Sequence, residues 1–182
     1  MTQATLVVVP GLGNSGPEHW QTHWEYKYPG TLRVQQQNWD HPDRQSWIDT
    51  LDRTVRETPG KVVLIAHSLA CALIANWASS AADISDKVLG ALLVSPADVD
   101  SPEHTPAEAH VFAPMPTHRL PFRSLVIASD DDPYVDIDRA RDFANAWGAD
   151  CISIGSAGHI NSKSNLGEWS AGQVYLDRLL SH

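Results

Sequence analysis

Residues 64–72 read Leu64-Ile65-Ala66-His67-Ser68-Leu69-Ala70-Cys71-Ala72, and this stretch decides the fold. An apolar run of strand length leads into a single serine, and an alanine-rich run of helical length leaves it. Ser68 is therefore predicted at a sharp strand-to-helix turn, the setting that exposes a serine hydroxyl as a nucleophile. Such a turn needs tiny residues two positions before and after the serine. Ala66 and Ala70 stand there, with slightly less backbone freedom than the usual glycines.

Two other interpretations of this stretch are possible. Ser68 could simply cap the helix that follows, since serine is a favoured N-cap residue. Cys71 is a rival nucleophile by residue type, but one turn into an apolar helix it is better explained as an inert core cysteine. The strand before Ser68 and the partners further along the chain favour Ser68 as the nucleophile.

The remainder of the chain alternates between strand and helix patterns. The expected strands are 6–9, 32–36, 61–66, 88–95, 123–129 and 151–154. The expected helices are 17–27, with Pro17 at its first position, 43–57, 69–82, 136–147 and 171–180. This alternation predicts an α/β fold, a parallel sheet with helices on both faces.

One proline-rich segment, 96–121, interrupts this alternation. A long irregular segment inside a compact domain is usually functional or mobile. We interpret it as a cap or rim over the end of the sheet where the site lies. The alternative is a solvated surface loop.

An acid and a base are expected after the last two strands. Asp130, Asp131 and Asp132 follow strand 123–129, and His159 lies in a small-residue loop after strand 151–154. Nucleophile, acid and base in this chain order are typical of hydrolases built on a nucleophile elbow. Imidazole would take the serine proton, and the carboxylate would orient and stabilise the imidazolium. The three aspartates could also form a solvated turn, and with nine histidines in the chain a single one is weak support.

The choice of Asp132 among the three aspartates depends on local geometry. An extended segment would direct Asp130 and Asp132 to one side and Asp131 to the other. Pro133 favours extended geometry at Asp132, which suits a residue that leaves a strand for a turn.

A glycine-rich loop, 10–16, follows the first strand. It lacks the lysine of a phosphate-binding loop and the dinucleotide fingerprint, so a nucleotide-binding function is disfavoured. With an elbow, the backbone N–H groups of Leu12 in this loop and of Leu69 are the candidates for an oxyanion hole. A plain tight turn is the alternative. Nearby, His19 and His23 have the spacing of a zinc pair, but the accompanying glutamate and a third ligand are missing. We expect a surface or rim helix there, and no metal.

The composition limits the partners. The chain has 182 residues, a formal net charge of −9 and two cysteines, which suits one domain over 1–182. The negative charge argues against nucleic acid or an anionic membrane as partner. The cysteines have no metal or disulfide spacing, no apolar run is long enough to span a membrane, and a signal-peptide pattern is missing. We expect a cytoplasmic protein without a cofactor.

Together these segments resemble the family of retinoblastoma-binding protein 9 and YdeN-like small α/β-hydrolases. The matching residues are Val9-Pro10-Gly11, Ser15-Gly16, His19-Trp20, Ala66-His67-Ser68-Leu69-Ala70, Asp131-Asp132-Pro133 and Gly158-His159. The resemblance implies a compact α/β-hydrolase fold of about six mostly parallel strands in the order 2-1-3-4-5-6. It also implies a metal-free triad of Ser68, Asp132 and His159.

The resemblance has limits. Ala70 stands where many members have glycine. The Leu-x-Cys-x-Glu motif that gave the family its name is missing, and the nearest string, 69–73, ends in leucine. Binding to retinoblastoma protein is therefore not expected. We expect a carboxylesterase-like serine hydrolase that cleaves an ester of a small substrate, with thioester or amide left open. The alternative is a binding or scaffold protein on a hydrolase fold with little turnover.

Overall fold

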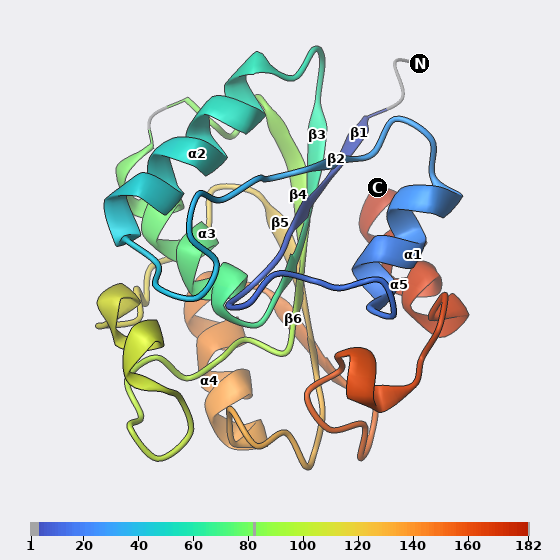
Figure 1. Ribbon diagram of the computed structural model, residues 1–182. Coiled ribbons are helices and arrows are strands. Elements are labelled where there is room, and N and C mark those ends of the chain that lie inside the picture. Colours follow the sequence, from blue (N-terminus) through green and yellow to red (C-terminus); the bar gives the residue numbers. More distant parts are fainter. Residues whose placement is uncertain (1–3, 82, 182) are drawn as a thin grey trace.

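Six parallel strands form a single sheet (Figure 1). The structure is a computed structural model that describes residues 4–81 and 83–181. The strands are β1 (Thr5–Val9), β2 (Leu32–Arg33), β3 (Val62–His67), β4 (Val88–Val94), β5 (Arg123–Ala128) and β6 (Asp150–Ser153). Their order in the sheet is β2-β1-β3-β4-β5-β6, with every neighbouring pair parallel. The predicted fold class and strand order are therefore confirmed.

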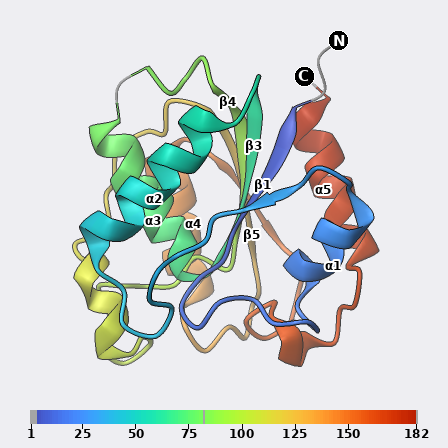
Figure 2. The ribbon, with the colours of Figure 1, turned by 45° about the horizontal axis from the view of Figure 1, so that its top comes forward.

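Helices cover both faces of this sheet. They are α1 (Trp20–Lys27), α2 (Arg44–Glu57), α3 (Leu69–Ser80), α4 (Ile137–Trp147) and α5 (Ser170–Leu180). Helices α2, α3 and α4 lie on one face and α1 and α5 on the other, as the turned view in Figure 2 also shows. Two short 3-10 helices, η1 (Ala107–Phe112) and η2 (Ser162–Ser164), lie in the connections after β4 and β6.

The strand residues supply both halves of the core by alternation. In β3, Leu64 and Ala66 pack with the α2, α3 and α4 side, whereas Val63 and Ile65 pack with the α1 and α5 side. All four are fully buried. This explains why β3 reads as a continuous apolar run, since a parallel strand between two helical layers has no solvent-facing side.

Three predicted elements differ from the structure by more than one residue at an end. Helix α1 begins at Trp20, and Pro17 lies in the preceding turn, because the Nδ1 atom of His19 accepts the Gln21 N–H (3.2 Å) and caps the helix. Of the expected surface or rim helix, the surface interpretation does not hold, since His19 and Trp20 are buried.

Strand 32–36 is reduced to the two residues of β2, although the Val34 N–H still donates to the Val8 carbonyl. The chain leaves the sheet after Arg33, whose guanidinium is held by Glu25, Asn14, Thr22 and the Ser15 carbonyl. Helix α3 ends at Ser80, before the predicted end of helix 69–82, and residue 82 is outside the described residues.

The segment 96–121 is mostly irregular but contains η1. Phe112 and Met115 are buried in the core beside α3. The side chain of Thr105 is buried as well. This segment is therefore not a solvated loop throughout, and it lies at the end of the sheet where the strands have their carboxyl termini (Figure 1).

Candidate active site

Ser68 lies at a strained turn between β3 and α3. Its backbone has φ 59° and ψ −123°, a region that residues other than glycine rarely adopt. Two hydrogen bonds hold the turn: the Ser68 N–H donates to the Val94 carbonyl, and the Cys71 N–H donates to the Ser68 carbonyl. Ser68 occupies the N-cap position of α3, but its side chain makes no capping hydrogen bond. The hydroxyl is therefore directed to another partner.

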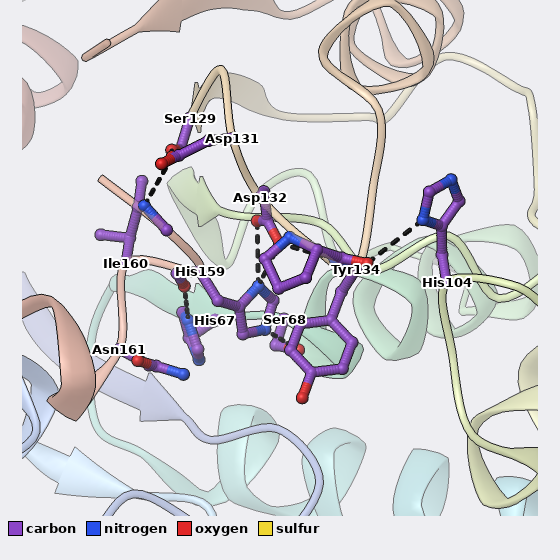
Figure 3. A network of polar contacts seen from close by, with 12 residues as sticks. His67, Ser68, His104, Ser129, Asp131, Asp132, Tyr134, His159, Ile160 and Asn161 are labelled. Carbon is purple, nitrogen blue, oxygen red and sulfur yellow. Dashed lines mark hydrogen bonds and ion pairs between the residues drawn. The ribbon is translucent and has the colours of Figure 1, made fainter. Parts of the chain in front are cut away.

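That partner is His159. The Oγ of Ser68 lies 2.7 Å from Nε2 of His159, and Nδ1 of His159 lies 2.9 Å from both carboxylate oxygens of Asp132 (Figure 3). The carboxylate requires that Nδ1 carries the proton, which leaves Nε2 free to accept the serine proton. The Asp132 side chain is fully buried and the His159 side chain nearly so. The structure thus brings together all three side chains that the sequence nominated.

The loop that carries His159 is fixed by the neighbouring aspartate. The Asp131 carboxylate accepts the Gly158 N–H (2.8 Å), and this bond is the main reason that its pKa lies below the usual range. Asp131 also accepts the Ser129 hydroxyl, and the Ser129 Oγ accepts the Ala157 N–H. The predicted alternation of the aspartates is wrong, because the chain turns at Asp130 and Asp131. Asp131 and Asp132 therefore both reach the His159 loop.

His67 contacts both the backbone and the ring of His159, the candidate base. Its Nε2–H donates to the His159 carbonyl (2.8 Å), and the two rings lie 4.8 Å apart. Burial is the main cause that holds the pKa of His67 well below 6.5, so the ring stays neutral. Tyr134 packs on the outer side, its ring centroid 4.4 Å from that of His159. Sequence reasoning gave no role to His67, although its position directly before Ser68 and its type were a signal.

The glycine-rich loop lies against the elbow. A Cβ atom on Gly11 would be 2.8 Å from the His67 carbonyl oxygen and 3.1 Å from the Leu69 nitrogen. The Leu12 N–H donates no backbone hydrogen bond within the described part of the chain, whereas the next two N–H groups donate to Trp39 and Gly11. These contacts place the Gly11–Leu12 backbone beside the nucleophile turn, where an oxyanion hole needs donors.

A cavity of about 290 Å³ opens beside Ser68. Thr105, Pro106 and Ala109 of the segment 96–121 form part of its wall. The segment is tied to the β5 loop by His104, whose ring hydrogen-bonds the Pro133 carbonyl and lies 3.4 Å from the Asp136 carboxylate. Mainly because of the Pro133 carbonyl, the pKa of His104 is raised.

The remaining candidates have other surroundings. Cys71 is fully buried in the core, and burial raises its pKa, which makes the thiol a poor nucleophile. His19 caps α1 and lines the cavity. Among residues 4–81 and 83–181, no three His, Cys, Asp or Glu side chains are grouped as a metal site would require. Within the same residues, no helix has the length and apolarity needed to span a membrane.

Comparison with solved structures gives close matches. A protein described as a YdeN-like hydrolase from Pectobacterium atrosepticum is 30% identical, with 97% of this chain and 90% of that chain covered and a TM-score of 0.85. The ydeN gene product from B. subtilis is 18% identical, with 99% and 100% covered and a TM-score of 0.77. A monoacylglycerol lipase from Paleococcus ferrophilus is 15% identical, with 98% and 96% covered and a TM-score of 0.70. The last two likenesses concern the fold alone.

No curated protein sequence matches the chain significantly. A family model described as "Serine hydrolase" matches residues 6–178. This range includes the nucleophile elbow, the aspartates after β5 and the His159 loop. The chain therefore belongs to the serine hydrolase family and is similar to its YdeN-like members.

Proposed function

We propose that this protein hydrolyses carboxylic esters through an acyl-enzyme on Ser68, with His159 as general base and Asp132 as the triad acid. The observation that carries the proposal is the hydrogen-bonded series from the Ser68 hydroxyl through His159 to Asp132, at the wall of a cavity. Such a series converts a weakly nucleophilic hydroxyl into an attacking group.

In the first half-reaction, His159 Nε2 takes the Ser68 proton while Oγ bonds to the ester carbonyl carbon. The bond to the alkoxide oxygen then breaks, and His159 returns the proton to this oxygen, which releases the alcohol. In the second half-reaction, His159 deprotonates a water molecule that attacks the acyl carbon. The acid leaves and Ser68 regains its proton. The ionised Asp132 stabilises the imidazolium in both half-reactions.

The oxyanion of each tetrahedral intermediate is assigned to the backbone N–H groups of Leu12 and Leu69. The Gly11 backbone lies close to the turn, since a Cβ there would be 3.1 Å from the Leu69 nitrogen, and this closeness supports the assignment. Backbone donors in this position would need little reorganisation as charge develops.

An ester is favoured over an amide because an alkoxide leaves more readily than an amide nitrogen, so ester cleavage demands less of the site. The cavity volume of about 290 Å³ suits a small substrate. The segment 96–121 serves as a rim that shapes this cavity, as the positions of Pro106 and Ala109 in its wall suggest.

A fluorophosphonate probe and a chromogenic ester, p-nitrophenyl butyrate, test the proposal together. Ser68→Ala removes the nucleophile, whereas Ser80→Ala, at the far end of α3, is the control. We expect wild type and the control to be labelled and to show a burst of p-nitrophenol followed by steady turnover. Ser68→Ala should show neither. Labelling of Ser68→Ala equal to wild type would refute the nucleophile, and labelling without turnover would favour a binding protein.

A further inference from the structure

A second cavity, of about 390 Å³, adjoins the active-site cavity at the His159 loop. Ser68 lines the first cavity, whereas the backbone of residues 156–158 contributes to the lining of the second. Four residues belong to both linings and therefore form the boundary between the two cavities. They are Tyr134, His159, Asn161 and Lys163.

The charges of these two linings differ from those of the chain as a whole. The chain has 22 Asp and Glu residues against 13 Lys and Arg residues. Among the described residues, neither lining includes an Asp or a Glu, and Lys163 is the only Lys or Arg in either. The Asp132 carboxylate is fully buried against His159 and lines neither cavity. A ligand in these cavities thus meets one positive charge and no carboxylate, which favours an anionic group.

The backbone of Lys163 is held in place although its side chain is exposed. Lys163 lies in η2, and its N–H donates to Oδ1 of Asn161 (3.0 Å). Ser164 ties η2 to the preceding loop, because its hydroxyl donates to the Ala157 carbonyl (2.7 Å) and accepts the Asn161 N–H (3.1 Å). The Lys163 ammonium has no hydrogen bond or ion pair with the described residues. Lys163 therefore offers an unpaired charge from a fixed position at the boundary of the two cavities.

Asn161 adds a neutral donor beside Lys163. Because its Oδ1 accepts the Lys163 N–H, the orientation of the amide is set and Nδ2 is left as a donor. Nδ2 makes no hydrogen bond within the described part of the chain, and in Figure 3 the nitrogen end of this amide is on the side toward Ser68. A carboxylate accepts hydrogen bonds from both an ammonium and an amide N–H. One cation with one neutral donor suits a single negative charge rather than the double charge of a phosphate.

We propose that Lys163, assisted by Asn161, binds a carboxylate of the substrate. The preferred substrates are then esters that carry a free carboxylate away from the bond that is cleaved. This inference rests on the proposed ester hydrolysis and names its substrate class. It makes Lys163 a specificity-determining residue. Because Lys163 is exposed, its attraction for an anion should be modest, up to about fivefold in affinity, and should be screened by salt.

Two pairs of esters that differ only in charge provide the measurement, at pH 7.5, where free carboxyl groups are ionised. Ethyl 5-carboxypentanoate and ethyl 5-carbamoylpentanoate differ in the acyl part, whereas 3-carboxypropyl and 3-carbamoylpropyl butyrate differ in the alcohol part. The selectivity is the ratio of kcat/KM for the carboxylate ester to kcat/KM for the carboxamide ester. We expect wild type to have a ratio of about 5 in at least one pair at low salt, and a ratio closer to 1 in 1 M NaCl.

Three variants connect this selectivity to one residue. Lys163→Gln removes the charge and should bring the ratio to about 1, whereas Lys163→Arg retains the charge and should retain most of the selectivity. Lys61→Gln is the matched control, because it removes a positive charge at the exposed residue before β3, at the opposite end of this strand from Ser68. Its ratio should equal that of wild type.

A wild-type ratio near 1 in both pairs, or a ratio that Lys163→Gln leaves unchanged, would overturn the role of Lys163 and leave ester hydrolysis standing. Equal losses of selectivity in Lys163→Gln and Lys61→Gln would also overturn it, since they would indicate an effect of net charge. Failure of the wild type to cleave all four esters and p-nitrophenyl butyrate would instead refute ester hydrolysis itself.

Discussion

Replacing Gly11 by alanine tests how closely the glycine-rich loop must approach the elbow. The added Cβ would be 2.8 Å from the His67 carbonyl oxygen, about 0.6 Å short of ordinary contact, and 3.1 Å from both the Leu69 nitrogen and Ser68 Cβ. Gly11 has no positive φ, so the demand for glycine is steric. The main obstacles are backbone atoms of the nucleophile turn, which cannot rotate away as a flexible side chain would. The loop must therefore move.

The expected cost follows from that displacement. The Leu12 N–H moves with Gly11, by about half an ångström, away from the position it needs to stabilise the oxyanion. Complete loss of one oxyanion donor lowers kcat about 10²- to 10³-fold, and a misplacement of about 1 Å can cost about 10²-fold. We expect Gly11→Ala to lower kcat about 10- to 100-fold, with a smaller change in KM.

Gly16→Ala is the matched control, because a Cβ there has no atom within 4 Å and Gly16 has no positive φ. Steady-state kinetics with p-nitrophenyl butyrate and thermal unfolding of both variants would be measured. The control should match wild type in its kinetic constants and in its thermal unfolding. A wild-type kcat in folded Gly11→Ala would refute the role given to Leu12. If the fall in the kcat of Gly11→Ala equals the fraction of the variant that is unfolded, the substitution impairs folding rather than catalysis.

Two further predictions concern ionisable groups. Asp132→Asn should lower kcat by about 10⁴. Asp130 accepts the exposed Ser153 hydroxyl, and an amide oxygen can still accept it, so Asp130→Asn should stay within about twofold. Similar kcat values for the two variants in steady-state assays would contradict the triad. His19 has a pKa lowered to about 3 in the fold, so unfolding takes up a proton below its unfolded pKa of about 6.5. Above pH 6.5 His19 therefore does not reduce the free energy of unfolding, whereas at pH 5 it lowers that free energy by about 2 kcal/mol. Urea unfolding at pH 8 and pH 5 measures this effect. The free energy of unfolding of His19→Asn should fall less between the two pH values than that of wild type, and an equal fall would contradict the role given to His19.

The fold could be predicted because its signals are local. The continuous apolar run of β3 and the small residues Ala66 and Ala70 define a buried strand and a sharp turn without reference to any other segment. The parallel sheet and its right-handed crossovers then leave few strand orders. The ends of β2 and α1 were predicted less well, because tertiary contacts decide them: Arg33 is held by α1 and the glycine-rich loop, and His19 starts the helix that Pro17 was expected to start.

The nominated site residues meet in the structure because the carboxyl ends of parallel strands share one edge. What sequence reasoning missed are the residues that act through a backbone atom of a distant segment. His67 donates to the carbonyl of His159, 92 positions away, and Asp131 accepts the N–H of Gly158, 27 positions away. Every residue has the same backbone groups, so the sequence does not mark the partner of such a bond.

These missed contacts explain why the base is rigid. Asp132 holds the His159 ring from the loop after β5, and His67 holds the carbonyl of the same residue from the end of β3. Asp131 holds the N–H of Gly158, the residue before His159. Three separate hydrogen bonds thus restrain one imidazole, whose Nε2 must stay within reach of Ser68 during two proton transfers. Preorganisation of this kind lowers the reorganisation needed at each step. The paired aspartates therefore have distinct tasks, since Asp132 holds the ring and Asp131 the loop that carries it.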